Sequence, residues 1–107
     1  MQAVYRTGPL PSAALEAAAA FHSRHATAIA ELLADAPESL VIVFPGAAYD
    51  HRGWRRAVIA DLARAHAPLR INGVVEGDPA RLAQTAAFLE MAKGVTGQLL
   101  AVDGLAA

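Results

Sequence analysis

The chain has 107 residues, of which 55% are hydrophobic and 18% are charged, and its nine Lys and Arg against ten Asp and Glu give a formal net charge of −1. This length supports one hydrophobic core and is too short for separate cofactor and substrate domains, which excludes a complete two-domain enzyme. The small net charge gives no long-range field to attract nucleic acid or an anionic membrane, and the absence of cysteine excludes a disulfide framework and a thiolate nucleophile.

Proline and glycine residues divide the chain into alternating strands and helices. The predicted elements are a strand at Ala3–Thr7, a helix at Pro11–Ala36, a strand at Leu40–Phe44, a helix at Asp50–His66, a strand at Leu69–Val75, a helix opened by Asp78-Pro79, and a strand at Gln98–Val102. Leu40–Phe44 is a continuous apolar run, so it is expected to be the central strand, covered on both faces. The order βαβαβαβ predicts a single α/β domain over residues 1–107 with a four-stranded parallel sheet.

Three features of the predicted helices carry further expectations. Asp50 is a suitable N-cap for the helix that follows it. One buried face is predicted on this helix and one on the last helix, formed by Trp54, Val58, Ile59, Leu62 and Ala65 and by Leu82, Ala86, Leu89 and Met91. Alanine crowds the first helix at residues 13–20, either because alanine favours helices or because small side chains allow close packing on a second subunit.

No segment is predicted to cross a membrane. Glu16, Arg24 and Glu31 interrupt the alanine-rich stretch, whereas a spanning helix needs about 18 apolar residues or more. Residues 1–6 do not have the pattern of a secretory signal. We therefore expect a soluble, cytoplasmic protein with no nucleic-acid or membrane partner.

Two segments, LRINGVVEG at 69–77 and TGQLLAVDG at 96–104, are the most specific features of the sequence. They resemble, in the same order, two strand signatures of the short-chain dehydrogenase/reductase family, I-R-V-N-x-V-x-P-G and T-G-x-x-x-x-V-D-G-G. Between them, Ala87-Phe88-Leu89 resembles the family's A-x-F-L segment, whereas Glu76 replaces the usual Pro and Leu105 the final Gly.

The resemblance covers nearly the whole chain but only the C-terminal half of the family fold, from its fourth strand onward. It implies half of a Rossmann-like fold, with an open first strand and with a left-handed last crossover that places the third helix on the opposite face of the sheet. The family's Gly-rich turn, where backbone amides approach the cofactor pyrophosphate, lies in the half that has no counterpart here. No cofactor is therefore expected to bind to this chain alone.

The catalytic positions implied by the resemblance lack the family's side chains. Pro45-Gly46 follows the predicted central strand, where the family has a Ser. Tyr49 is followed four residues later by Gly53 instead of the family's Lys. A shifted alignment puts Arg52 and Arg56 in the Tyr and Lys positions, and an Arg does not exchange protons near neutral pH.

Other polar residues do not complete a site. The sole Lys, Lys93, lies in another predicted helix, and the sole Asn, Asn72, lies in a predicted strand. His22 and His25 are three residues apart, but two metal ligands are too few, so a surface or interface pair is expected. Trp54 is expected to be a core or interface anchor. We therefore predict no catalytic, cofactor-binding or metal-ligating residue.

One cluster is a candidate anion-binding site. His51, Arg52, Arg55 and Arg56 lie in the first two turns of the predicted helix at 50–66, near the positive end of its dipole. Backbone N–H groups and guanidinium groups there would bind a phosphate, a carboxylate or an acidic patch of a partner. The alternative is a solvated helix end in which Asp50 is the cap and the Arg stems cover apolar surface.

The sequence leaves three functions open. The leading hypothesis is a noncatalytic, truncated short-chain dehydrogenase-like protein that acts as a homodimer or as an interaction module for an unidentified protein partner. The family implies dimerisation through the helices at 11–36 and 50–66, in a four-helix bundle. The alternatives are an NAD(P)-dependent oxidoreductase that obtains its nucleotide-binding half from another chain, and a small-anion binder at the Arg cluster.

Overall fold

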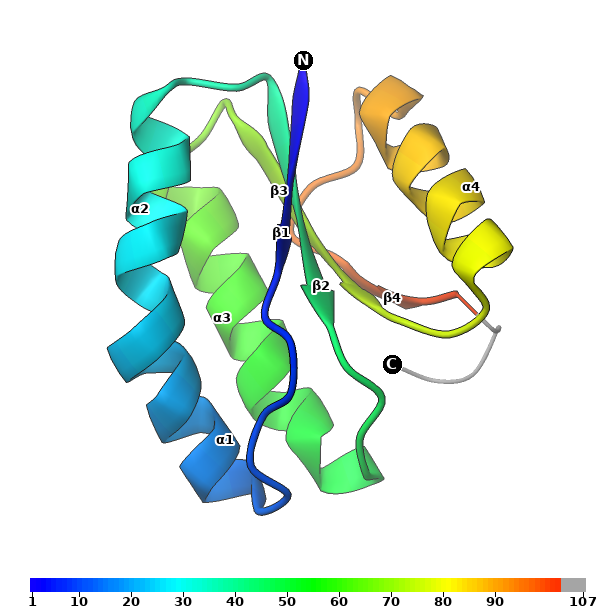
Figure 1. Cartoon of the computed structure of the whole chain (residues 1–107). Coiled ribbons are helices and arrows are strands. Elements are labelled where there is room, and N and C mark those ends of the chain that lie inside the picture. Colours follow the sequence, from blue (N-terminus) through cyan, green and yellow to red (C-terminus); the bar gives the residue numbers. More distant parts are fainter. Residues whose placement is uncertain (103–107) are drawn as a thin grey trace.

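The computed structural model describes residues 1–102 and places them in one sheet with helices on both faces (Figure 1). The strands β1 (Gln2–Arg6), β2 (Ser39–Phe44), β3 (Arg70–Val75) and β4 (Leu99–Ala101) are neighbours in that order. Each neighbouring pair is parallel. The predicted α/β fold, with a four-stranded parallel sheet that forms half of a Rossmann-like fold, is confirmed.

β2 is the buried centre of the sheet, and all its residues are inaccessible to solvent. Leu40, Ile42 and Phe44 enter the larger core, whereas Val41 and Val43 enter the core on the opposite face. Successive side chains of a strand point to opposite faces, so a strand that is covered on both faces needs an apolar residue at every position. This requirement explains the apolar run that marked the strand in the sequence.

The helices form one layer of several segments and one layer of a single helix. α1 (Ala14–Ala20), a π-helical turn (Phe21–His25), α2 (Ala26–Ala34) and α3 (Arg52–Ala65) cover one face, and α4 (Pro79–Met91) covers the other (Figure 1). Because consecutive strands are neighbours, a helix on the opposite face gives the last crossover the opposite hand from the first two. The placement of the third helix implied by the resemblance is therefore confirmed.

Arg70, at the start of β3, connects the end of α4 to the sheet by hydrogen bonds. Its Nη1 donates to the carbonyl oxygens of Leu89 and Ala92, each at 2.8 Å, and its Nη2 donates to that of Glu90 at 3.2 Å. The last carbonyl groups of a helix lack partners within the helix and carry partial negative charge, which a guanidinium satisfies. Arg70 is only 8% exposed, and its role in the structure is to cap α4.

Asn72 and Thr96 hold the segment before β4 against β3. The Asn72 side chain donates to the Val95 carbonyl oxygen at 3.0 Å and accepts from the Gln98 N–H at 3.1 Å. Thr96 accepts the N–H of Ile71 on its hydroxyl oxygen at 3.1 Å. The polar residues of both family-like segments thus have structural roles, while Asp103, Gly104 and Leu105 lie outside the described residues.

Four expectations about the helices were wrong. The helix expected at 11–36 begins at Ala14, ends at Ala34 and contains a π-helical turn. Asp50 is not an N-cap, because it lies inside a 3₁₀ turn at Tyr49–His51, and α3 begins after that turn with no side-chain cap. Met91, expected on a buried face, is 76% exposed, because at 3.6 residues per turn it lies about 200° around α4 from the buried Leu89. Ala65, expected on the buried face of the helix at 50–66, is also exposed, at the end of α3.

Within residues 1–102, no helix is both long and apolar enough to span a bilayer.

Candidate functional site

A cavity lies beyond the carboxyl end of β2, at the start of α3. Its volume is about 280 Å³, and it is lined by Leu10, Pro11, Ser12, Pro45, Gly46, Ala47, Ala48, His51 and Arg55. In parallel α/β sheets, ligands bind beyond the carboxyl ends of the strands. A ligand site would therefore be expected at this cavity. The four residues of the predicted anion site make different contacts around it.

His51 is a buried structural residue. Its Nε2 lies 2.9 Å from the Ser12 carbonyl oxygen, so this nitrogen donates, and its Nδ1 accepts from Trp54 Nε1 at 3.3 Å. Both ring nitrogens are engaged, and the side chain is 2% exposed. His51 ties the segment before α1 to the first turn of α3 and has no remaining donor for an anion.

Arg55 is the buried cation of the site and is 3% exposed. Its Nη1 donates to the Pro45 carbonyl oxygen at 2.9 Å, and its guanidinium carbon lies 4.9 Å from the centre of the Phe44 ring. Its Nε and Nη2 are buried with no hydrogen-bond partner among the described residues. Burial lowers the pKa of the Arg55 guanidinium, because the charged form loses its hydration.

Arg52 and Arg56 diverge from each other. The Arg52 guanidinium lies 4.1 Å above the Tyr49 ring, and its Nε is also buried and unpartnered among residues 1–102. A smaller cavity of about 50 Å³ is lined by both Arg52 and Arg55. Arg56 is exposed and lines neither cavity. His51 lines this smaller cavity as well, but within the predicted cluster only Arg52 and Arg55 keep buried donors without partners among the described residues.

The backbone amides at this helix start are already used. The Arg52 N–H donates to the Tyr49 carbonyl oxygen, and the His51 N–H donates to that of Ala48 at 3.1 Å. The 3₁₀ turn thus satisfies amides that a regular helix N-terminus would leave for a ligand. The N–H groups of His51 and Arg52 are therefore not available to an anion.

The positions that the resemblance aligned with the family's catalytic residues are Pro45, Gly46, Tyr49 and the arginines of α3. Pro45 and Gly46 have no polar side chain, and Tyr49 is 73% exposed and carries Arg52 on its ring face. Lys93 follows α4 and lies 3.6 Å from the Glu38 carboxylate, at the opposite end of the sheet from the start of α3. No Tyr–Lys pair therefore forms among the described residues.

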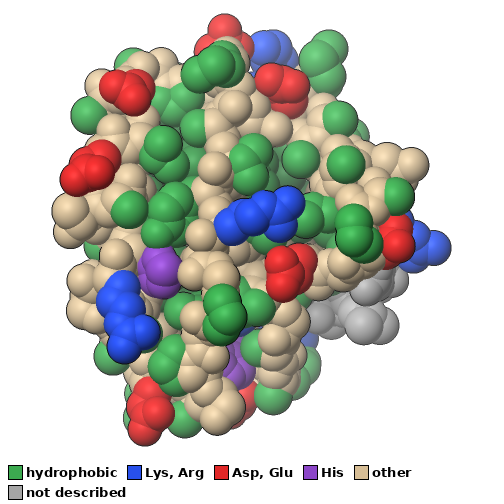
Figure 2. All heavy atoms as spheres, in the orientation of Figure 1, with side chains coloured by type: hydrophobic (Ala, Val, Ile, Leu, Met, Phe, Trp, Pro, Cys, Tyr) green, Lys and Arg blue, Asp and Glu red, His purple; other side chains and the backbone are tan. Residues whose placement is uncertain are grey.

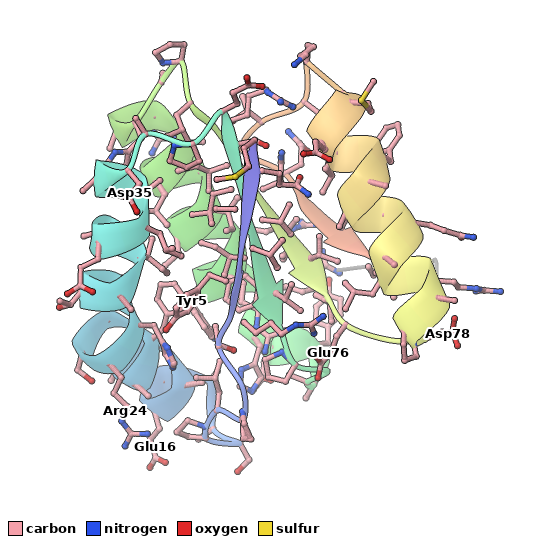
Figure 3. The ribbon with its side chains drawn as sticks, turned by 45° about the horizontal axis from the view of Figure 1, so that its top comes forward. Tyr5, Glu16, Arg24, Asp35, Glu76 and Asp78 are labelled. Atoms are coloured by element: carbon pink, nitrogen blue, oxygen red, sulfur yellow. The ribbon has the colours of Figure 1, made fainter. Side chains whose placement is uncertain are left out.

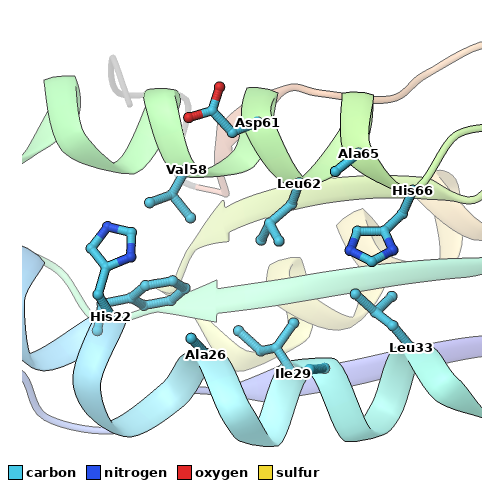
Figure 4. A pocket seen from close by; sticks show the side chains of 11 residues that line it. His22, Ala26, Ile29, Leu33, Val58, Asp61, Leu62, Ala65 and His66 are labelled. Carbon is cyan, nitrogen blue, oxygen red and sulfur yellow. The ribbon is translucent and has the colours of Figure 1, made fainter.

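A groove between α2 and α3 is a feature that the sequence did not reveal (Figure 4). Its volume is about 270 Å³, and it is lined by Phe21, His22, Ala26, Ile29, Ala30, Leu33, Val58, Asp61, Leu62, Ala65 and His66. Figure 4 shows Ala26 and Ala65 on opposite walls, where small side chains leave the apolar floor accessible. The available signal was the presence of alanines on two helices that were expected to be neighbours.

His22 and His25, both in the π-helical turn, make different contacts. The Tyr5 hydroxyl oxygen and His25 Nδ1 are hydrogen-bonded at 2.6 Å, which joins β1 to the helical layer. Figure 3 shows Tyr5 between the strand and the first helical segments. Burial, and then the charge of Arg24, lowers the pKa of His25. His22 instead lines the groove. Residues 1–102 contain no cluster of three or more His, Cys, Asp or Glu that could hold a metal ion.

The parallel sheet, with ligand-sized space beyond the carboxyl end of β2, defines a Rossmann-like α/β half-domain. Residues 5–102 match the family model of short chain dehydrogenase-like proteins, and the chain belongs to this family. No curated protein and no solved structure matches the chain.

Proposed function

We propose that this chain is a noncatalytic, cytoplasmic short chain dehydrogenase-like module that corresponds to the C-terminal half of the dehydrogenase fold and pairs with a second copy through its helical layer. The groove between α2 and α3 is the observation that carries this proposal. The paired surfaces are those of the helices expected at 11–36 and 50–66, now seen as α1, the π-helical turn, α2 and α3.

The lack of catalysis is supported by the side chains at the carboxyl end of the sheet. Hydride transfer to or from a carbonyl needs a group that gives or takes a proton at that oxygen. The guanidinium group of an arginine is not a general acid or base, so neither Arg52 nor Arg55 supplies this group, and Tyr49 has no Lys beside it among the described residues. These groups bind and orient anions better than they transfer protons.

A cofactor titration separates this proposal from a split oxidoreductase. We expect NADPH and NADH to leave the melting temperature of the isolated chain unchanged. A rise that saturates with cofactor concentration would instead favour the alternative, in which the chain is part of an NAD(P)-dependent enzyme.

Helix pairing is supported by the shape and composition of the groove. Ala26, Ala30 and Ala65 are exposed, so a second helix can approach the groove closely without a steric clash. Phe21 and Ile29 lie beneath them in the larger core, so a partner that closes the groove removes apolar surface from water. Two copies related by a twofold axis would form the four-helix arrangement.

Sedimentation of matched alanine variants tests helix pairing. We expect Ala30→Glu to weaken association about a hundredfold, because a carboxylate buried at an interface without a partner costs about 2–5 kcal/mol. Ala83→Glu is the matched control, because Ala83 is an exposed alanine on α4 outside the groove. Equal masses for wild type and Ala30→Glu at every concentration would refute this interface.

We further propose that Arg55 binds a carboxylate in the cavity at the start of α3. Nε–H and one Nη2–H of a guanidinium point in parallel and match the two oxygens of a carboxylate, and these are the two Arg55 nitrogens that lack partners. The other cavity walls are mainly Leu, Pro, Gly and Ala, which suits a small apolar body. Since both nitrogens are shielded from solvent, binding requires a local shift of the segment after β2.

Isobutyrate and its neutral amide, isobutyramide, distinguish binding of the carboxylate from binding of the apolar isopropyl group in the cavity. We expect isobutyrate to raise the melting temperature of the wild type and of the exposed-site control Arg56→Met with saturation, and to have no such effect on Arg55→Met. Isobutyramide should not stabilise any of them. An equal response to the amide, or a response that persists in Arg55→Met, would refute the site.

A further inference from the structure

The outer edge of β1 presents a regular set of backbone groups. Toward β2, the Thr7 N–H donates to the Val43 carbonyl oxygen at 3.1 Å, and the Met1 carbonyl oxygen accepts the Glu38 N–H at 3.0 Å. The N–H and C=O of a strand residue point to the same side, and this side alternates along the strand. Ala3 and Tyr5 therefore also face β2, whereas Gln2, Val4 and Arg6 direct their N–H and C=O outward.

Among the described residues no strand or helix lies beyond this edge, although the Glu90 side chain of α4 bonds to one of its N–H groups, that of Gln2. β1 is the outermost strand, and Figures 1 and 3 both show it in front of the sheet with no element beyond it. Val4 is 47% exposed at the centre of the strand. In Figure 2, which looks onto this edge, hydrophobic side chains gather between the two helical layers. An uncovered strand edge of this kind is a template for another strand.

The charges at the two ends of β1 are complementary. The Arg6 guanidinium, at one end, lies 3.9 Å from the carboxylate of Glu76, the residue that follows β3. Glu90 of α4, at the other end, accepts the outward N–H of Gln2 on Oε2 at 3.3 Å. The strand thus has a cation at its carboxyl end and a carboxylate beside its amino end.

We infer that β1 pairs antiparallel with β1 of a second copy, centred on Val4. In this register Val4 lies opposite its own copy and Gln2 lies opposite Arg6 of the other chain. All three outward-facing residues of each strand then form hydrogen-bonded pairs, and the Gln2 N–H exchanges its bond to Glu90 for one to the Arg6 carbonyl oxygen of the other chain. Arg6 then lies beside Glu90 of the other copy, which joins opposite charges at both ends. A parallel, in-register pair would instead place Arg6 beside Arg6.

This inference does not depend on the helix pairing proposed above. The β1 edge and the groove between α2 and α3 have no lining residue in common. Antiparallel pairing about a twofold axis would join two four-stranded sheets into one continuous sheet. A second copy fits this edge because each copy supplies Arg6 on β1 and Glu90 on α4 as complementary charges, together with the matching row of donors and acceptors.

Single cysteines test the register, because the chain has no native cysteine. Val4 is the only β1 residue that lies opposite itself, so Val4→Cys should form an intermolecular disulfide about tenfold faster than Gln2→Cys or Arg6→Cys alone. A mixture of Gln2→Cys and Arg6→Cys chains should cross-link to each other. Cross-linking of Val4→Cys at the rate of the other single variants would overturn the register.

A proline tests the pairing itself without relying on oxidation. The Val4 N–H points away from β2, so Val4→Pro removes an outward donor and keeps the bonds between β1 and β2. We expect this variant to keep the wild-type circular dichroism and to sediment with half the wild-type mass. In a second test, Arg6→Glu should weaken association and Glu90→Arg added to it should restore association. An unchanged mass for both Val4→Pro and Arg6→Glu would refute the proposal.

Discussion

Two buried arginines show how differently the two ends of the sheet are built. Arg70, at the amino end, is 8% exposed and donates to three carbonyl oxygens at the end of α4. Arg55, beyond the carboxyl end, is 3% exposed, donates to one carbonyl oxygen and keeps two buried nitrogens without partners among residues 1–102. Arg70 therefore uses its guanidinium to satisfy carbonyl groups of the fold, whereas Arg55 keeps two guanidinium nitrogens without hydrogen-bond partners among the described residues.

This difference explains which family features the chain retains. Arg70, Asn72 and Thr96 belong to the two segments that resemble dehydrogenase signatures, and each has hydrogen bonds within the fold. The positions that the resemblance aligns with the family's catalytic residues hold proline, glycine, tyrosine and arginine. Arg70, Asn72 and Thr96 stabilise the half-domain through their hydrogen bonds, which do not depend on the residues at the carboxyl end of the sheet.

Replacement of Arg70 is expected to have the largest effect on stability. Arg70→Met leaves three carbonyl oxygens at the end of α4 without a donor, and we expect the free energy of unfolding to fall by about 3 kcal/mol. Urea denaturation measures this loss, with Arg81→Met on the exposed side of α4 as the control. If Arg70→Met lowered the free energy of unfolding no more than Arg81→Met does, Arg70 would not stabilise the fold as proposed, and Arg70 and Arg55 would not differ in this respect.

Asn72 is a second residue of β3 whose side chain forms hydrogen bonds within the fold. Asn72→Ala leaves the Val95 carbonyl oxygen and the Gln98 N–H without their side-chain partner, and we expect a loss of about 2 kcal/mol. The same denaturation experiment on Gln84→Ala, an exposed amide on α4, provides the baseline. If both variants were equally stable, the segment before β4 would not depend on this side chain.

The smallest expected effect is a pH dependence from His25. Its pKa in the folded chain lies below its ordinary value, because burial and the charge of Arg24 disfavour the cation. The unfolded chain therefore binds a proton first as the pH falls, so this contribution to stability is complete above about pH 6.5 and decreases below it. Denaturation at pH 7.5 and 5.5 should show a larger decrease for wild type than for His25→Gln, and identical decreases would contradict this role.

The elements that could be predicted from sequence are those defined by local chemistry. The apolar run of β2 indicated a strand covered on both faces, and Asp78 caps α4 by accepting the Arg81 N–H at 3.1 Å, as its position before proline indicates. The break in the first helix was not predicted, because an alanine-rich sequence gives little contrast between helix faces. Asp50 was misassigned because a 3₁₀ turn precedes α3.

The candidate site depends on contacts that are distant in sequence. His51 is buried because it reaches the carbonyl oxygen of Ser12, which lies 39 residues earlier. Arg55 is buried because its guanidinium packs on Phe44 and reaches Pro45 in the preceding strand and loop. The sequence placed these residues in one helical segment, but it contained no information on which of them would lose their hydration or keep unpaired donors.

Arg55→Met tests most directly whether the buried Arg55 guanidinium, with two unpartnered nitrogens, fails to stabilise the fold. Methionine fills a similar volume without a charge, so the variant removes a desolvated cation together with one hydrogen bond. We predict that the free energy of unfolding of the ligand-free protein stays within about 1 kcal/mol of wild type or increases. A loss as large as that of Arg70→Met would show that Arg55 is a completed structural residue and would contradict the account.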